Sequence, residues 1–217
     1  MHLPTWHISV RFKTTFDLLL TMIIPIHVFG SPALRVEADP VTEDGVDFQK
    51  LVDDMIETMH GASGIGLASP QVGRTERLFV VDLSPVTRDE ESQAGGPDVM
   101  WEEPVVFVNP EILEVSEEMS EYEEGCLSIP EVTEVVERPV AIRIKYLDRE
   151  LQEQETELSG MPARVVQHEY DHLNGVLFTD RISPLRRRLL KRRLRDMAKG
   201  EVEADYPLVA PVKAARR

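Results

Sequence analysis

The pentapeptide His168-Glu169-Tyr170-Asp171-His172 restricts the structure and chemistry of this chain more than any other segment. Two histidines four residues apart lie on one face of a helix, a single turn from each other, where both imidazoles can bind the same metal ion. Glu169 then flanks the ion, and its carboxylate can move a proton without being a ligand. The alternative is a chance pair of histidines on a solvated helix, so the prediction depends on a third ligand.

The sequence around this motif has the pattern of a helix. Helical periodicity extends from Pro162 to Asn174, Pro162 is acceptable in a first helical turn, and Gly175 is placed to end the helix. A second, amphipathic helix is predicted over residues 47–59, where apolar residues recur every three or four positions. Runs rich in β-branched residues predict strands at residues 78–83, 105–108 and 141–146. Residues 84–104, between the first two strands, predict a solvated loop.

The third ligand has to come from elsewhere in the chain, because a catalytic metal usually has three protein ligands and keeps one position for water. One class of metalloproteases extends the motif with a glycine and a further histidine, but this chain has Phe178 at the histidine position. Cys126, the only cysteine, cannot form an intramolecular disulfide, and Gly125 and Pro130 suggest that it lies in a shaped turn. Cys126 is therefore the predicted third ligand, and a small buried thiol is the alternative.

Composition and charge narrow the classes of function. The 217 residues, 42% of them hydrophobic, suit one globular domain, and no apolar run is long enough to span a membrane. The net charge of −15 argues against general DNA binding, because most of the surface would repel phosphates. A single cysteine fits a reducing compartment such as the cytoplasm.

We expect one catalytic domain over residues 22–200. Residues 1–21 are interpreted as an unstructured extension or a stretch that is not translated, with translation starting at Met22, and a signal peptide is the alternative. Residues 184–199 predict a basic amphipathic helix within the domain, and residues 201–217 predict a tail.

Three segments in order resemble the signature motifs of the peptide deformylase family: Gly64 to Gln71, Glu124 to Pro130, and Gln167 to Gly175. The resemblance extends over about residues 24–190. It implies an α+β fold in which a central metal-binding helix is surrounded by antiparallel and mixed β-sheet, with a C-terminal helix. It also implies metal-dependent removal of the formyl group from the N-terminal formylmethionine of nascent polypeptides, with release of formate, in the cytoplasm.

The resemblance implies a role for individual residues. Glu169 carries over as the general acid and base, and the Gln71 side-chain amide and the Leu127 backbone N–H carry over as donors to the oxyanion formed in formamide hydrolysis. The metal ligands carry over onto Cys126, His168 and His172. The substrate-binding positions are Ile65, Gly66, Tyr122, Glu124, Gly125, Met161 and Val165.

Other residues of the motifs have a simpler interpretation. Gly64 and Gly66 let the backbone approach a ligand closely. Ser69 stands where the family usually has a second alanine, and Thr133 stands where some relatives have an arginine, which affects peripheral contacts. Arg164 lies near the predicted pocket with no orientation assigned.

The resemblance also implies a cofactor and partners. One divalent ion is expected, Fe2+ in the cell, with Zn2+, Ni2+ or Co2+ as other occupants, because a thiolate and two imidazoles can hold any of them. Because the family acts on chains leaving the ribosome, helix 184–199 is predicted to dock near the exit tunnel, and a helix packed on the domain with solvated charges is the alternative. A metalloprotease, a non-catalytic binding protein of the same fold and a structural metal site stay open at this point.

Overall fold

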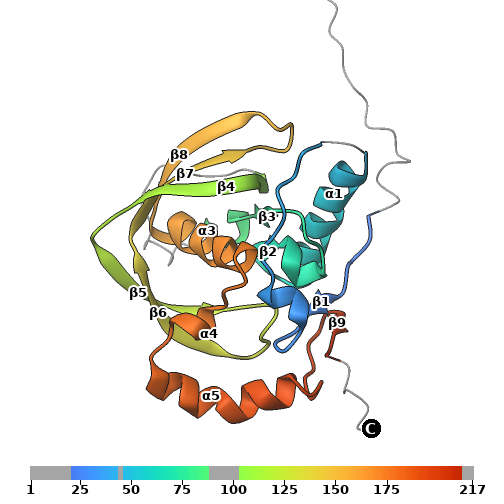
Figure 1. The fold of residues 1–217 in the computed structure, drawn as a ribbon, viewed down its shortest axis with the longest axis vertical. Coiled ribbons are helices and arrows are strands. Elements are labelled where there is room, and N and C mark those ends of the chain that lie inside the picture. Colours follow the sequence, from blue (N-terminus) through green and yellow to red (C-terminus); the bar gives the residue numbers. More distant parts are fainter. Residues whose placement is uncertain (1–20, 44–45, 88–102, 212–217) are drawn as a thin grey trace, which may run out of the picture.

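The computed structural model describes residues 21–43, 46–87 and 103–211. Its main sheet has five strands, in the spatial order β2-β3-β4-β7-β8, and every neighbouring pair is antiparallel. The strands are β2 (Gly66–Ala68), β3 (Leu78–Val81), β4 (Val105–Val115), β7 (Ala141–Leu147) and β8 (Glu153–Ser159). The sheet curves around one helix, α3 (Gly160–Leu173), which lies in the middle of the molecule (Figure 1).

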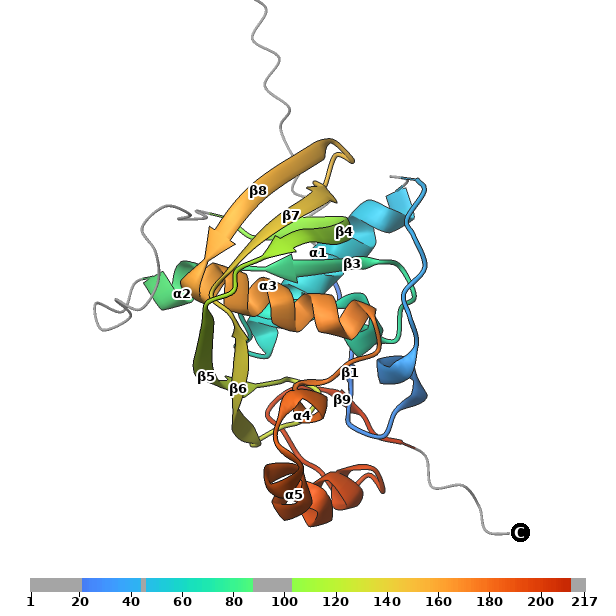
Figure 2. The same ribbon diagram turned by 60° about the vertical axis from the view of Figure 1, so that its left-hand side comes forward.

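Both faces of the sheet are covered, so its inner strands are apolar on both sides. Side chains alternate along a strand: Phe79 packs with Val166 of α3, whereas Val80 packs with Met55 of α1 (Val46–Gly61) on the opposite face. Figure 2 shows this order of layers, with α3 and α1 on either side of the sheet. The sheet therefore fixes where α3 lies.

The remaining strands and helices close the lower side of the molecule in these views. Strands β5 (Met119–Gly125) and β6 (Thr133–Pro139) form an antiparallel hairpin beside α3 (Figure 1). Helices α4 (Phe178–Arg181) and α5 (Pro184–Met197) pack on β6 through a third apolar cluster that includes Ile129, Leu194 and Met197. The short elements are η2 (Pro32–Arg35), η3 (Ser69–Val72) and α2 (Ser84–Thr87).

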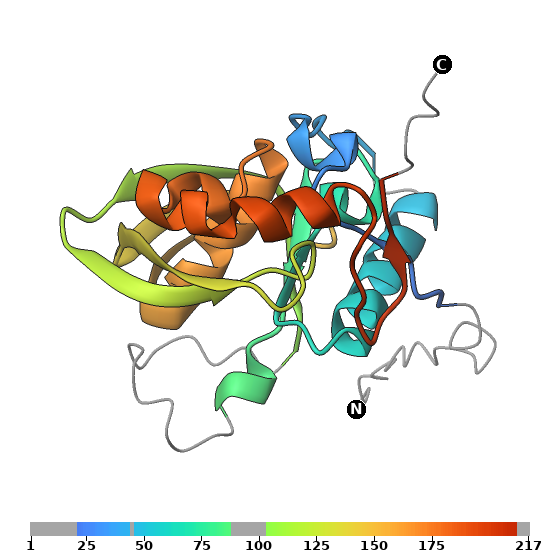
Figure 3. The same cartoon turned by 90° about the horizontal axis from the view of Figure 1, so that it is seen from below.

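The segment after α5 folds back onto the domain, as Figure 3 shows. Its strand β9 (Leu208–Val209) pairs in parallel with β1 (Ile26–His27). The expected tail from residue 201 is therefore wrong for residues 201–211: Tyr206 and Leu208 pack against the apolar cluster beneath α1, and that burial holds the segment in place.

The predicted helices and strands are otherwise confirmed, with shifted ends. The helix predicted over 162–174 begins two residues earlier, at Gly160, because Gly160 takes a positive φ of 60° that turns the chain from β8 into the helix. The predicted loop 84–104 starts with the short helix α2, and most of that loop and the expected extension 1–21 lie outside the described residues. Among the described residues, no helix combines the length and apolar character needed to cross a bilayer.

Candidate active site

The three predicted ligands lie together. Cys126 follows the last residue of β5, and His168 and His172 come from α3, one turn apart on its inner face. Their ligand atoms lie within 4.8 Å of one another, and the Cys126 sulfur is 3.2 Å from Nε2 of His172. The β5 end and α3, distant in sequence, thus converge on one point.

These donors fit a transition-metal ion. One thiol and two imidazoles are the ligand types that zinc and iron take in open, three-ligand sites. Two buried polar atoms beside the cluster, Nδ1 of His172 and Oε2 of Glu169, have no hydrogen-bond partner among the described residues. Burial and the nearby charge of His168 lower the pKa of His172 well below its usual value, which keeps its imidazole neutral as a ligand must be.

Phe178 stands at the position where the metalloprotease pattern has its third histidine. The Phe178 side chain is buried, and its ring lies parallel to that of His168 at a centroid distance of 6.2 Å. Gly175 itself has a φ of 67°, and a Cβ there would meet the backbone of Arg35 at 3.0 Å. A phenylalanine at position 178 therefore packs behind the first histidine instead of supplying a ligand.

Glu169 is buried beside the ligands. Burial raises the pKa of its carboxyl group to about 7, so the group can both accept and release a proton near neutral pH. A Cβ built on Gly66 would lie 2.4 Å from Oε1 of Glu169. Glycine has only a hydrogen atom in place of a Cβ, so Gly66 leaves room for the Glu169 carboxylate.

Gln71 presents its amide donor to the same point. Its Oε1 accepts a hydrogen bond from the Ala68 backbone N–H at 2.8 Å, which fixes the orientation of the amide. Its Nε2 then lies 3.5 Å from the Cys126 sulfur and 3.3 Å from the Ser128 hydroxyl. The structure thus brings the amide of Gln71 next to the ligand cluster, as expected.

A cavity of about 880 Å³ opens over these residues. Its lining includes Cys126, His168, Glu169, Gln71 and Leu127. It also includes every predicted substrate-binding position: Ile65, Gly66, Tyr122, Glu124, Gly125, Met161 and Val165. Sequence reasoning missed several parts of the lining, among them residues 61–63, Val86 and residues 203–206 of the segment after α5, because nothing in their sequence indicates which pocket they approach.

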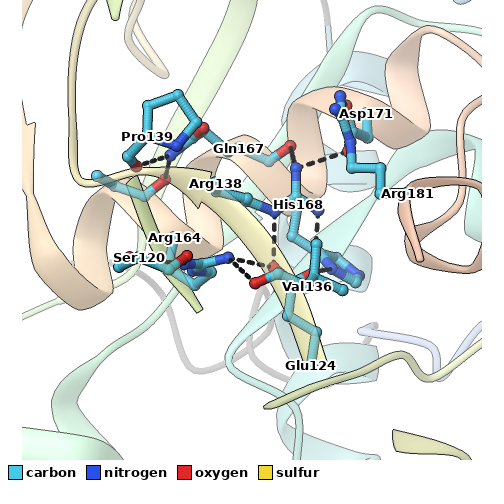
Figure 4. Close-up of polar contacts among 11 residues, drawn as sticks. Ser120, Glu124, Val136, Arg138, Pro139, Arg164, Gln167, His168, Asp171 and Arg181 are labelled. Atoms are coloured by element: carbon cyan, nitrogen blue, oxygen red, sulfur yellow. Dashed lines mark hydrogen bonds and ion pairs between the residues drawn. The ribbon is translucent and has the colours of Figure 1, made fainter. Parts of the chain in front are cut away.

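Behind the cavity lies an ion network, which we define as the buried residues Glu124, Arg138, Arg164 and Asp171 together with the exposed Arg181 (Figure 4). Arg138 is 2% exposed; its Nε and Nη2 donate to Glu124 at 2.6 and 2.9 Å, and its Nη1 donates to Asp171 at 2.7 Å. Arg164 donates to Glu124 at 3.0 Å, and Arg181 pairs with Asp171. Three arginines therefore neutralise two buried carboxylates.

The network reaches the metal ligands through Glu124. Oε2 of Glu124 lies 2.9 Å from Nδ1 of His168, so that nitrogen carries the proton and Nε2 is left toward Cys126. Burial would raise the pKa of Glu124, but hydrogen bonds from Arg138 and His168 outweigh it and hold that pKa well below the usual range. Burial likewise lowers the pKa of His168, but hydrogen bonds with Cys126 and Glu124 raise it above its usual value. A bound ion would take the place of a proton on Nε2, while Nδ1 keeps its own.

The surroundings of Glu124 and Arg164 add to what the sequence indicated, since no orientation was assigned to Arg164. Glu124 lines the pocket, but its two oxygens are bonded to Arg138, Arg164 and His168, which fits orientation of His168 better than contact with a substrate. Arg164 points inward, toward Glu124 and the Ser120 carbonyl. Arg138 and Asp171 were missed, because an arginine near a strand end and an Asp inside a metal motif give no sign that they pair.

Comparisons with known proteins agree on one family. The family described as Polypeptide deformylase matches residues 23–188. A peptide deformylase from Salinibacter ruber is 63% identical over 188 residues, covering 87% of this chain and 95% of the relative. A peptide deformylase from Christiangramia forsetii is 42% identical and covers 90% and 100%, respectively.

Solved structures give the same result. The crystal structure of peptide deformylase from Thermotoga maritima has 45% sequence identity and a TM-score of 0.66, covering 75% of this chain and 99% of that one. A peptide deformylase from Legionella pneumophila has 38% identity and a TM-score of 0.69, covering 81% and 95%. The expected α+β fold is confirmed by these neighbours and by the helices and antiparallel sheets of this chain.

Proposed function

The chain belongs to the peptide deformylase family, and from that premise we propose which of its residues bind the metal and perform the reaction. The enzyme is a metal-dependent hydrolase that removes the formyl group from the N-terminal formylmethionine of nascent polypeptides. Cys126, His168 and His172 are the proposed ligands. The observation that supports them is the convergence of one thiol and two imidazoles within 4.8 Å, beside a cavity whose wall contains Cys126, His168 and Glu169.

Glu169 is the proposed proton carrier. When bound, the metal supplies Lewis-acid activation of a water molecule and of the formyl carbonyl. Glu169 accepts the proton of the attacking water and passes it to the departing amine nitrogen, so one carboxylate serves as base and then as acid. Its burial and its pKa of about 7 suit both steps, although the positive ion acts to lower that pKa.

Gln71 and Leu127 are the proposed donors to the oxyanion. Negative charge develops on the formyl oxygen as water adds to the carbon, and fixed donors in a water-poor site stabilise it. The Gln71 amide is held by the Ala68 N–H, and Leu127 directly follows a ligand in the chain. The fixed Gln71 amide and the position of Leu127 beside Cys126 support this proposal.

We further propose Fe2+ as the ion in the cell, with Zn2+, Ni2+ or Co2+ as alternative occupants. The donor set accepts each of these ions, so the proposal rests on the family. Protein prepared without oxygen should contain one ion per chain, and the activity of separately loaded samples identifies the ion that supports turnover. Iron-loaded protein no more active than zinc-loaded protein would contradict the iron assignment.

The residue assignments are tested by substitution and by choice of substrate. Cys126→Ala and His172→Ala should each lose bound metal and activity together, whereas His60→Ala, a histidine paired with Asp82 outside the cavity, should keep both. Wild-type protein should release formate from a formyl-Met peptide and leave internal peptide bonds intact. Cleavage of an internal bond at a comparable rate would favour a protease instead.

The location and ribosome contact of the enzyme are also proposals. A single thiol that must stay reduced and a substrate that emerges from the ribosome both fit the cytoplasm. We propose that α5 docks near the ribosomal exit tunnel. The helix carries seven cations, and Leu185 and Leu189 are 70% and 75% exposed on its surface, so both its charge and its apolar side chains are available to a partner.

The docking proposal has a matched control. Arg188→Glu with Lys191→Glu reverses two charges on α5, and Arg74→Glu with Lys145→Glu reverses two charges elsewhere on the domain. Co-sedimentation with ribosomes at low salt should fall only in the first variant, and binding of the wild type should weaken as salt rises. Equal binding of all three proteins would contradict it.

A further inference from the structure

The segment after α5, residues 201–211, is attached to the domain at several points, and we call it the C-terminal strap. It lies beyond residues 23–188, the part of the chain that matches the family. Its Pro207 and Val209 carbonyls accept hydrogen bonds from the backbone N–H groups of Ile26 and Val28, at 2.9 and 3.2 Å. The strap is therefore a fixed part of the fold, although the family match does not include it.

The strap also reaches the active site. Residues 203–206 line the same cavity as Cys126, His168 and Glu169. The Tyr206 hydroxyl donates a hydrogen bond to the Leu127 carbonyl at 2.8 Å, and its ring packs in the apolar cluster beneath α1. Burial raises the pKa of Tyr206 to about 12, and the negative charge of Cys126 adds to the effect, so the hydroxyl keeps its proton.

Leu127 belongs to a short turn whose successive carbonyls are each held by a different group. The Cys126 carbonyl accepts from the Ile129 N–H at 2.8 Å, and the Ser128 carbonyl accepts from the Phe29 N–H at 2.8 Å. The Leu127 carbonyl lies between them and is held by Tyr206. Together these bonds fix the peptide planes on both sides of Leu127, and hence the direction of its N–H.

We propose that Tyr206 is a positioning residue for deformylation, and that the C-terminal strap forms the outer wall of the substrate cavity. The inference rests on the proposed role of the Leu127 N–H as a donor to the oxyanion. The hydroxyl of Tyr206 holds that N–H in line with the forming charge, and the ring of Tyr206 contacts the bound peptide. The two parts of one side chain therefore act on different kinetic constants.

The hydroxyl and the ring of Tyr206 affect different kinetic constants because they act at different stages of the reaction. An oxyanion donor acts on the transition state, so a misdirected N–H lowers kcat and changes KM little. Loss of the ring widens the cavity and weakens binding of substrate, which raises KM. A merely structural role of Tyr206 would instead lower thermal stability or metal content and leave the kinetics of the folded, loaded enzyme unchanged.

Two substitutions and a control separate these effects, measured on the metal-loaded full chain with a formyl-Met tripeptide. Tyr206→Phe removes only the hydroxyl: kcat should fall about fivefold, which corresponds to about 1 kcal/mol, while KM stays within about twofold. Tyr206→Ala should lower kcat similarly and also raise KM severalfold, so the phenylalanine variant restores KM and not kcat. Tyr146→Phe, the same change in a half-buried tyrosine of β7 outside the cavity, should change neither constant.

Metal content and thermal unfolding of each variant complete the test. Stoichiometric metal and an unfolding temperature near that of the wild type, with the expected fall in kcat, support the proposal. A wild-type kcat in Tyr206→Phe overturns the positioning role, as does a loss of kcat that only parallels a loss of metal or of folded protein. Failure of the wild type itself to release formate would instead contradict the function proposed above.

Discussion

Replacing Arg138 by methionine should destabilise the protein more than any other single change in the ion network. Among the residues that the structure describes, Arg138 is the one cation that contacts both Glu124 and Asp171, and it is 2% exposed. Methionine fills a similar unbranched volume, so the change removes four hydrogen bonds of the guanidinium, three of them to carboxylates, without leaving a large void. Two buried carboxylates then lose the cation they share.

The loss of unfolding free energy depends on the ion pairs that remain in the Arg138→Met variant. Breaking a buried ion pair by removing one partner costs about 3–5 kcal/mol, because the other charge stays buried without compensation. Arg164 still contacts Glu124 and Arg181 still contacts Asp171, so the two sites do not each cost the full amount. We expect a loss of about 3–5 kcal/mol in total, which a domain of typical stability survives in the folded state.

The pH dependence of this loss has a definite sign. The folded-state pKa of Glu124 in the wild type lies below its unfolded value near 4.3, so its contribution is complete at neutral pH and disappears as the pH falls through the folded-state pKa. Without Arg138 the same carboxyl is buried with less compensation, so its pKa rises and it takes up a proton more easily. The difference in unfolding free energy between wild type and Arg138→Met should therefore be largest near pH 7 and narrow toward pH 4.

Urea unfolding at several pH values, with metal removed and again with metal added, measures these quantities. Arg143→Met is the control, since Arg143 also contacts two carboxylates but lies on the exposed side of β7, where ion pairs contribute little. Metal affinity of Arg138→Met should also fall, by roughly 10- to 100-fold, as Glu124 no longer holds His168 as firmly. Equal, small losses in the Arg138 and Arg143 variants at pH 7 would refute the reasoning.

Three further changes test the chemistry. Glu169→Gln should keep stoichiometric metal while turnover falls by roughly two to four powers of ten, and loss of metal in this variant would make Glu169 a ligand or a structural residue. Gln71→Ala should keep its fold and metal but lose roughly a hundredfold in kcat, as expected for an oxyanion donor, and a near-wild-type rate would remove it from the mechanism. Gly66→Ala should lower kcat by at least about tenfold with metal retained, because the new Cβ needs the space that Glu169 occupies. Gly61→Ala is the control and should be close to neutral, since a Cβ at this end of α1 meets only Ile23, at 3.3 Å. Equal rates of the two alanine variants would contradict the steric reasoning.

The cluster of Cys126, His168 and His172 could be predicted from sequence, because the chemistry of metal binding restricts the spacing of ligands. His168 and His172 must be one helical turn apart to share an ion, and a lone thiol is rare enough to identify as their partner. The long helices α1, α3 and α5 were predictable for a similar reason, since their apolar faces repeat over many residues, whereas the four-residue helices α2 and α4 were not. Strands β5 and β8 were not, because their exposed sides are rich in Glu, Ser and Gln and give no apolar alternation.

Gly66 illustrates how the structure can add a cause that the sequence did not suggest. The sequence suggested that glycine here lets the backbone approach a ligand closely. The structure shows that Glu169 is the group that needs the space. A glycine indicates that a side chain would be in the way, but only the fold shows what it would meet.

The ion network could not be predicted for a more general reason. Glu124 begins the motif that contains Cys126, Asp171 lies inside the histidine motif, and Arg138 belongs to a separate strand, so only the packing of β5 and β6 against α3 brings them together. Charged residues are mostly exposed, and sequence alone therefore favours a solvated position for each of them. Once they are buried together, the position of His168 depends on Arg138, although these two residues contact each other only through Glu124. A substitution at Arg138 should accordingly change the metal affinity of the protein as well as its stability. A change in metal affinity distinguishes a network that orients His168 from one that only fills the interior.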